Sequence, residues 1–118
     1  MKKILIVEDT RNIRENIAEY LELSGHEVLT AENGLEGWEI LQGQNPDLVI
    51  CDVKMPKLYG FEIKERANGE EALKDTPFIF LSAAAQKTDI AKGRSVGAIA
   101  YMTKPFDMNE LLTWVEKV

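Results

Sequence analysis

Three short apolar runs constrain the fold of this chain more than any other feature. They cover residues 4–7 (ILIV), 48–51 (LVIC) and 78–81 (FIFL), and each is continuous rather than alternating. The strands of a parallel sheet show this pattern because helices cover both faces of the sheet and bury both sets of side chains. Two weaker runs, at residues 28–31 and 98–102, bring the set of expected strands to five.

The segments between these runs have helical spacing. Two stripes of apolar residues recur every three or four positions: Ile13, Ile17 and Leu21, and then Leu35, Trp38 and Leu41. Such spacing places side chains on one face of a helix, and we expect both stripes to be buried. A third helix is expected from about Tyr59, and Gly69 leaves residues 69–75 as either its last turn or a loop. The alternation predicts an α/β fold of the (βα)5 type, a parallel sheet with helices on both faces.

Residues at the expected helix boundaries agree with this pattern. Asn33 precedes Glu36 by three positions, and Asp107 precedes Glu110 in the same way. An Asx residue followed by Glu at this distance is typical of the capping box that begins a helix. Gly25 is placed to end the first helix, because glycine readily adopts the left-handed conformation found there.

Composition narrows the class of protein. The 118 residues, 45% apolar and 29% charged, predict one globular domain over residues 1–118. The net charge of -6 argues against direct nucleic-acid binding, which needs clustered basic residues. The single cysteine, Cys51, excludes an internal disulfide and fits a reducing compartment. The first apolar run is too short for a signal peptide or membrane span, so we expect a cytoplasmic protein without membrane contact.

Polar side chains at the ends of four expected strands are candidates for a common site. Glu8 and Asp9 come after the first, Asp52 after the third, Ser82 after the fourth and Lys104 after the fifth. Ligands bind at the carboxyl ends of the strands in open parallel sheets. We therefore expect three carboxylates, a hydroxyl and an ammonium group to form one site.

The chemistry of this set favours a metal ion and a phosphoryl group. Three carboxylates this close repel one another, so either one stays protonated or a cation lies among them. Oxygen ligands without His or Cys favour Mg²⁺. A carboxylate beside this ion can attack phosphorus to form an aspartyl phosphate. Lys104 and Ser82 could then bind phosphoryl oxygens, so that catalysis consists of positioning and charge neutralisation.

With these residues in place, the chain resembles the receiver domain of bacterial two-component response regulators over essentially its whole length. The motifs that carry the resemblance are ILIVEDT, DLVICDVKMP, Gly60, FIFLSA and YMTKPF, in this order. The resemblance implies a flavodoxin-like, CheY-like fold with strand order 2-1-3-4-5. It also implies a phosphorylation-controlled signalling switch that assists its own phosphoryl transfer and dephosphorylation, rather than a conventional enzyme.

The resemblance implies a role for each site residue. Asp52 would accept the phosphoryl group from a sensor histidine kinase or a histidine phosphotransfer protein. Asp9, Asp52 and the backbone carbonyl of Lys54 would ligate Mg²⁺, and Glu8 would act through a water molecule.

Two further residues would bind the phosphoryl group, and one would report its presence. Ser82 and Lys104 would contact phosphoryl oxygens. Tyr101 would turn inward as Ser82 moves toward the phosphate. This movement would remodel the surface of the fourth helix, fifth strand and fifth helix, where an output domain or a second copy would bind.

Three alternatives differ in their sequence patterns. A haloacid-dehalogenase phosphatase carries D-x-D after its first strand, a spacing that Glu8-Asp9-Thr10 lacks. An unphosphorylated interaction module of the same fold would normally have lost a key acid or the lysine. A flavin-binding role is disfavoured because no Ser/Thr/Gly-rich phosphate loop follows the first strand. The sequence leaves open the cognate kinase and whether the domain stands alone or belongs to a longer regulator or hybrid kinase.

Overall fold

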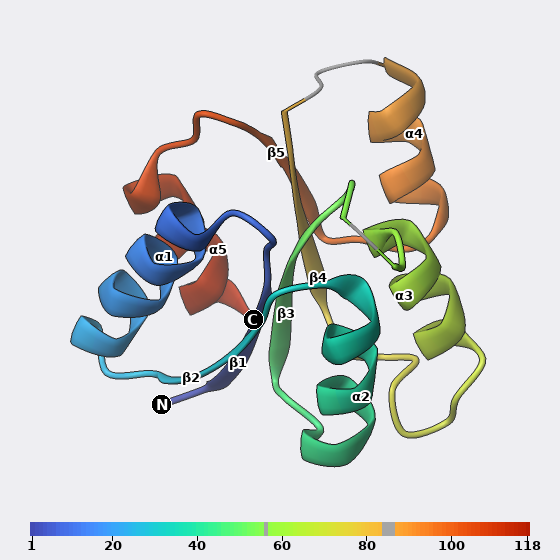
Figure 1. Cartoon of the computed structure of the whole chain (residues 1–118), viewed down its shortest axis with the longest axis horizontal. Coiled ribbons are helices and arrows are strands. Elements are labelled where there is room, and N and C mark those ends of the chain that lie inside the picture. The colour runs from blue at the N-terminus through green and yellow to red at the C-terminus, as the bar shows by residue number, and fades with distance from the viewer. Residues whose placement is uncertain (56, 84–86) are drawn as a thin grey trace.

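The computed structural model describes every residue except 56 and 84–86, so Pro56 of the DLVICDVKMP motif lies outside the described residues. Strands and helices alternate along the chain (Figure 1). Their bounds are β1 Lys3–Val7, α1 Arg11–Leu23, β2 Glu27–Ala31, α2 Gly34–Gln44, β3 Leu48–Asp52, α3 Gly60–Asn68, β4 Phe78–Ser82, α4 Lys87–Ser95, β5 Ala100–Thr103 and α5 Met108–Lys117.

The strands form one parallel sheet in the order β2-β1-β3-β4-β5, which confirms the expected topology. Helices α1 and α5 cover one face of the sheet, and α2, α3 and α4 cover the other (Figure 1). From β1 the chain first adds β2 on one side and then β3 on the other, so β1 and β3 are neighbours. Folds of this type bind ligands at the carboxyl ends of the two strands where the direction changes.

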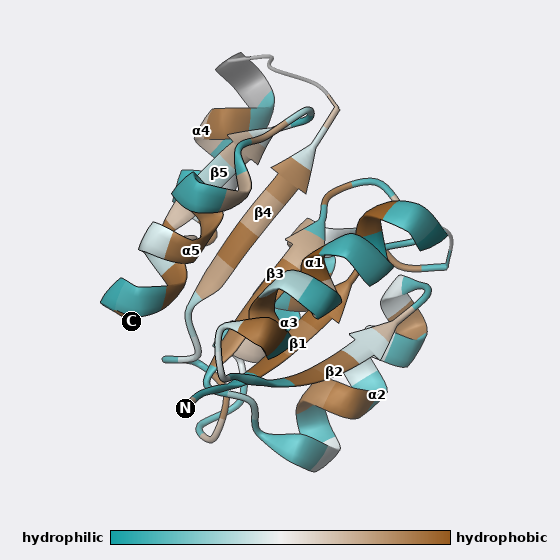
Figure 2. Cartoon of the chain, turned by 90° about the vertical axis from the view of Figure 1, so that its left-hand side faces the viewer, coloured by the Kyte–Doolittle hydropathy of each residue, from teal (hydrophilic) through white to brown (hydrophobic). Residues whose placement is uncertain are grey.

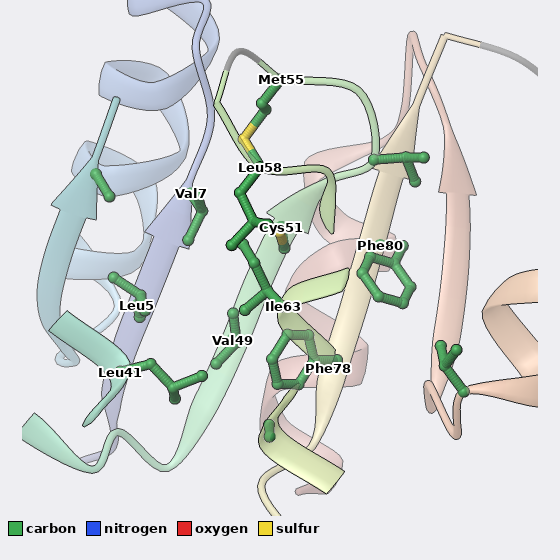
Figure 3. Close-up of a cluster of buried hydrophobic side chains, with 14 of the residues drawn as sticks. Leu5, Val7, Leu41, Val49, Cys51, Met55, Leu58, Ile63, Phe78 and Phe80 are labelled. Carbon is green, nitrogen blue, oxygen red and sulfur yellow. The ribbon is translucent and has the colours of Figure 1, made fainter. Parts of the chain in front are cut away.

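Each face of the sheet has its own hydrophobic core, and neighbouring residues of one strand belong to different cores. Val49 and Cys51 of β3 join the core under α2, α3 and α4 (Figure 3). Leu48 and Ile50 join the core under α1 and α5. The apolar runs are continuous for this reason, and the sheet appears as an apolar layer between helices with polar outer surfaces (Figure 2).

The predicted stripe on α2 is partly wrong. Leu41 is buried, but Leu35 is 44% exposed. The buried start of this helix is formed by Gly34 and Gly37, where an added Cβ would overlap the Leu58 carbonyl and the Val7 side chain, respectively. Two glycines therefore bring the helix backbone close to its neighbours and turn Leu35 toward the surface.

The predicted boundaries hold with small differences. Asn33 Oδ1 accepts a hydrogen bond from Glu36 N at 2.9 Å, as expected of a helix cap. Asp107 caps α5 through the backbone N–H of Asn109 rather than that of Glu110. Gly25 follows α1 with φ of 94°, the left-handed conformation that favours glycine.

Two further expectations concern element lengths. Strand β5 begins at Ala100, two residues later than expected, and runs to Thr103. Helix α3 ends at Asn68, and the segment that follows forms turns. Among the described residues, no helix has the length and apolar character needed to cross a membrane.

Candidate functional site

A pocket of about 350 Å³ lies at the carboxyl end of the sheet. It is lined by Asp9, Asp52, Lys54, Ser82, Ala83 and Lys104. Residues predicted from four separate strand ends therefore meet, because parallel strands direct their carboxyl ends to one edge. Asp52 and Ser82, the last residues of β3 and β4, are buried.

Lys104 joins two of the acidic residues. Its Nζ lies 2.7 Å from Glu8 Oε1 and 3.2 Å from Asp52 Oδ2. The backbone N–H of Lys104 donates to Ser82 O at 2.7 Å, so β4 helps to position the lysine. The Lys104-Pro105 peptide bond is cis.

Glu8 is fully buried and is held on all sides. Its backbone N–H donates to Ala31 O at 3.1 Å, and its Oε2 accepts from Thr10 N at 3.0 Å. Its backbone carbonyl accepts a hydrogen bond from Arg14 Nη1 at 2.9 Å. The Glu8 carboxylate is thus held close to Asp9 and Asp52, and its Oε1 pairs with the Lys104 ammonium group.

Arg14 is the site residue that our sequence reasoning missed. It is only 9% exposed, although it is charged. A signal was present, because Arg14 precedes Ile17 by three positions and Leu21 by seven and so falls on the buried face of α1. A charged residue at such a position needs a polar partner inside the protein.

The three acidic residues are close enough to share a cation. One carboxylate oxygen each from Glu8, Asp9 and Asp52 lies within 4.8 Å of the others. Asp9 is exposed and the other two are buried. Oxygen donors alone, at the mouth of an open pocket, fit a hard ion such as Mg²⁺ that retains part of its water shell.

The pKa values of Asp52 and Lys104 reflect burial and the crowding of carboxylates at the pocket. Burial and the neighbouring Glu8 raise the pKa of Asp52 from 3.8 to about 7, even though Lys104 acts in the opposite direction. Burial lowers the pKa of Lys104, but the bond to Glu8 and the charge of Asp52 outweigh it and raise that pKa. One ammonium group therefore does not neutralise the acidic cluster.

Tyr101 and Ser82 lie together beside the pocket. Burial raises the pKa of the Tyr101 phenol, and a hydrogen bond with Ser82 lowers it by less. The Tyr101 ring packs against α4, where a Cβ on Gly93 would lie 3.1 Å from Tyr101 Cδ2. The Ser82 hydroxyl in the pocket is thereby linked, through Tyr101, to helix α4.

The start of α3 lies against the end of β3. Gly60 N donates to Val53 O at 2.8 Å, and a Cβ on Gly60 would overlap the backbone carbonyl of Asp52. The Gly60 of the sequence motif is thus required for this close approach, which brings Lys54 to the pocket.

Comparison with known families identifies the domain. The family model described as response regulator receiver domain matches residues 4–116. The chain belongs to this family. Receiver domains are signalling domains activated by phosphorylation, and not conventional enzymes. This result decides against the haloacid-dehalogenase alternative.

Individual relatives agree with the family. This receiver domain is 38% identical over 117 residues to the phosphate regulon transcriptional regulatory protein PhoB of Pseudomonas aeruginosa, covering 99% of this chain and 51% of PhoB. It is 36% identical over 118 residues to Protein PilH of the same organism, covering 100% of this chain and 98% of PilH. The chain spans about half the length of the first curated relatives that it matches.

Solved structures give the same result. The chemotaxis protein CheY4 of Vibrio cholerae superposes on this receiver domain with a TM-score of 0.92 at 33% identity, covering 100% of this chain and 98% of CheY4. The non-phosphorylated HemR receiver domain from Leptospira biflexa gives 0.90 at 32% identity, covering 99% and 93%. The expected CheY-like, flavodoxin-like fold is thereby confirmed.

Proposed function

We propose that Asp52 is the phosphoryl acceptor of this receiver domain. The observation that carries the proposal is its position: Asp52 ends the central strand, 3.2 Å from the Lys104 ammonium and beside the pocket wall formed by Ser82. The donor would be a sensor histidine kinase or a histidine phosphotransfer protein, since response regulators receive phosphate from histidine kinases.

The donor set favours Mg²⁺ as the cofactor. Asp9 and Asp52 would hold the ion together with the backbone carbonyl of Lys54, and Glu8 would reach it through a water molecule. When bound, the ion supplies positive charge to the phosphoryl oxygens. The raised pKa of Asp52 supports this assignment, because burial and the neighbouring Glu8 charge disfavour the ionised carboxylate unless a cation lies beside it.

The residues of the chain then have distinct tasks in transfer. An ionised Asp52 oxygen forms a bond to phosphorus as the bond between phosphorus and the donor breaks. The Lys104 ammonium neutralises one phosphoryl oxygen, and the Ser82 hydroxyl donates a hydrogen bond to another. The same open pocket would admit the water that later hydrolyses the aspartyl phosphate, so the domain would assist its own dephosphorylation.

The output would be a change of surface. As Ser82 turns toward the phosphoryl group, Tyr101 would move inward and alter the face formed by α4, β5 and α5. An output domain or a second copy of the chain would bind there. We propose that residues 1–118 form one receiver domain acting in the cytoplasm, which the buried free thiol of Cys51 supports.

Labelling with a small phosphodonor tests this proposal. Incubation with acetyl phosphate and Mg²⁺ should add one phosphoryl mass to the chain. After the donor is removed, this label should be lost slowly. Asp52→Asn should abolish labelling, whereas Asp75→Asn, a change of an exposed aspartate remote from the pocket lining, should leave it intact. Equal labelling of Asp52→Asn and the unchanged chain would refute the assignment.

A further inference from the structure

We propose that Arg14 is a positioning residue that sets the orientation of the Glu8-Asp9 peptide and thereby the affinity of the pocket for Mg²⁺. The inference rests on the proposed function, since it concerns the same metal site. It assigns a role to a buried cation that does not itself line the pocket.

Arg14 contacts the peptide group between Glu8 and Asp9. Arg14 Nη1 donates to the backbone oxygen of Glu8 at 2.9 Å, in a buried hydrogen bond. That oxygen belongs to the peptide group that joins the two neighbouring acidic residues. Because a peptide group is planar, holding its oxygen also fixes the direction of the Asp9 N–H and the path by which the chain leaves β1.

The same peptide region is held from the opposite side. The Glu8 N–H donates to Ala31 O of β2, so strand β2 fixes one end of the residue and helix α1 fixes the other. Arg14 Nη2 also lies 3.7 Å from Glu32 Oε1, immediately after β2. A planar guanidinium presents several donors in a fixed arrangement, so Nη1 can serve the Glu8 carbonyl while Nη2 faces Glu32.

Loss of this contact would leave a buried carbonyl without a hydrogen-bond donor. Such a group costs free energy until the backbone moves to find another partner. The movement available here is rotation of the Glu8-Asp9 peptide, which redirects Asp9. Asp9 is the exposed member of the acidic cluster, so its position depends on the backbone that carries it.

Charge and geometry predict opposite effects of Arg14 on metal affinity. If Arg14 acted only through its positive charge, it would repel Mg²⁺, and its removal would tighten binding. If Arg14 acts by positioning, its removal weakens binding despite the loss of a repelling charge. The sign of the change therefore separates the two mechanisms.

The experiment measures the Mg²⁺ dissociation constant of the full chain from the amide NMR shifts of Asp9 and Val53, far below the unfolding temperature. We expect Arg14→Met to raise this constant by about tenfold, the usual scale for groups that orient a metal ligand. Arg14→Lys, which retains the charge and one donor site, should give an intermediate value. A merely structural role would lower the unfolding temperature and leave the constant of the folded protein unchanged.

Arg11→Met is the matched control. Arg11 lies in the same helix, is 78% exposed at its side chain and pairs with Glu15 at 2.9 Å. Its replacement removes the same charge without touching Glu8, so Mg²⁺ binding should stay unchanged or become slightly tighter.

The outcomes distinguish this inference from the proposed function. Absence of Mg²⁺ binding by the unchanged chain would overturn the proposed metal site and this inference together. If the unchanged chain binds Mg²⁺ and Arg14→Met binds it equally or more tightly, only the inference about Arg14 would be overturned. If Arg14→Met does not fold, Arg14→Lys decides, and an unchanged constant in that variant would overturn the inference.

Discussion

Lys104, after the last strand, lies 2.7 Å from the buried carboxylate of Glu8, after the first strand. This pair joins residues that follow the first and the last strand. The same ammonium group lies 3.2 Å from Asp52 Oδ2. Lys104 thus contacts two of the three clustered carboxylates, whose negative charges outnumber its single positive charge. The electrostatic properties of the domain follow from this imbalance.

Glu8→Gln should lower the pKa of Asp52. The charge of Glu8 is the second-largest cause, after burial, of the rise to about 7. Its removal also leaves Lys104 with Asp52 as its remaining partner in the pocket. The Asp52 carboxyl carbon, followed by NMR in metal-free buffer, should titrate at lower pH in this variant. Glu15→Gln, which alters an exposed residue of α1, should not move that titration, and an unchanged Asp52 in Glu8→Gln would contradict the explanation.

Asp52→Asn should stabilise the metal-free protein at high pH. A carboxyl whose pKa rises from 3.8 to about 7 on folding binds more protons in the folded state between those values. The contribution of Asp52 to stability therefore falls as pH rises from about 4 to 7, and the loss is complete above pH 7. We expect Asn to gain about 1–3 kcal/mol at pH 8 and little at pH 4.

Urea unfolding of both proteins in EDTA at several pH values measures this difference. The control is Asp75→Asn, which removes an exposed carboxylate that does not line the pocket and should not reproduce the gain at pH 8. A gain that is equal at pH 4 and pH 8 would show that Asp52 is not the titrating group.

If the proposed metal site is correct, Mg²⁺ should raise the unfolding temperature, since the ion would bind the folded pocket and not the unfolded chain. The gain is about 2.7 kcal/mol when the concentration is a hundred times the dissociation constant. Asp9→Asn should lose most of this gain, because Asp9 is the exposed carboxylate of the proposed Mg²⁺ site. Differential scanning calorimetry with and without Mg²⁺ measures both effects, and an undiminished gain in Asp9→Asn would remove Asp9 from the site.

Gly60→Ala should destabilise the domain by about 1–3 kcal/mol, the usual cost of inserting a methyl group into a packed region. The added Cβ would overlap the backbone oxygen of Asp52. Gly43→Ala is the matched control, since nothing lies within 4 Å of its Cβ position in α2. That change should stabilise the protein by about 0.5–1 kcal/mol through helix propensity. Similar unfolding midpoints for the two variants would contradict the close approach.

Local pattern was sufficient to predict the strands and the acidic edge of the sheet. The apolar runs at β1, β3 and β4 are continuous because alternate residues enter different cores. The pattern was misleading at Leu35, because spacing alone does not reveal that α2 approaches its neighbours through Gly34 and Gly37. It also did not show that Arg14 reaches the Glu8 carbonyl, a contact that depends on where α1 packs.

The order of strands and helices and the residues at the strand ends could be predicted from the sequence, because periodicity and polarity act within a few neighbouring positions. The way in which Lys104 pairs with the acidic residues depends instead on tertiary structure. Lys104 could have served Asp52 alone, yet the parallel register brings it to Glu8 as well. Burial and the nearby charge of Glu8, both set by contacts between distant segments, raise the pKa of Asp52, and Lys104 acts against them.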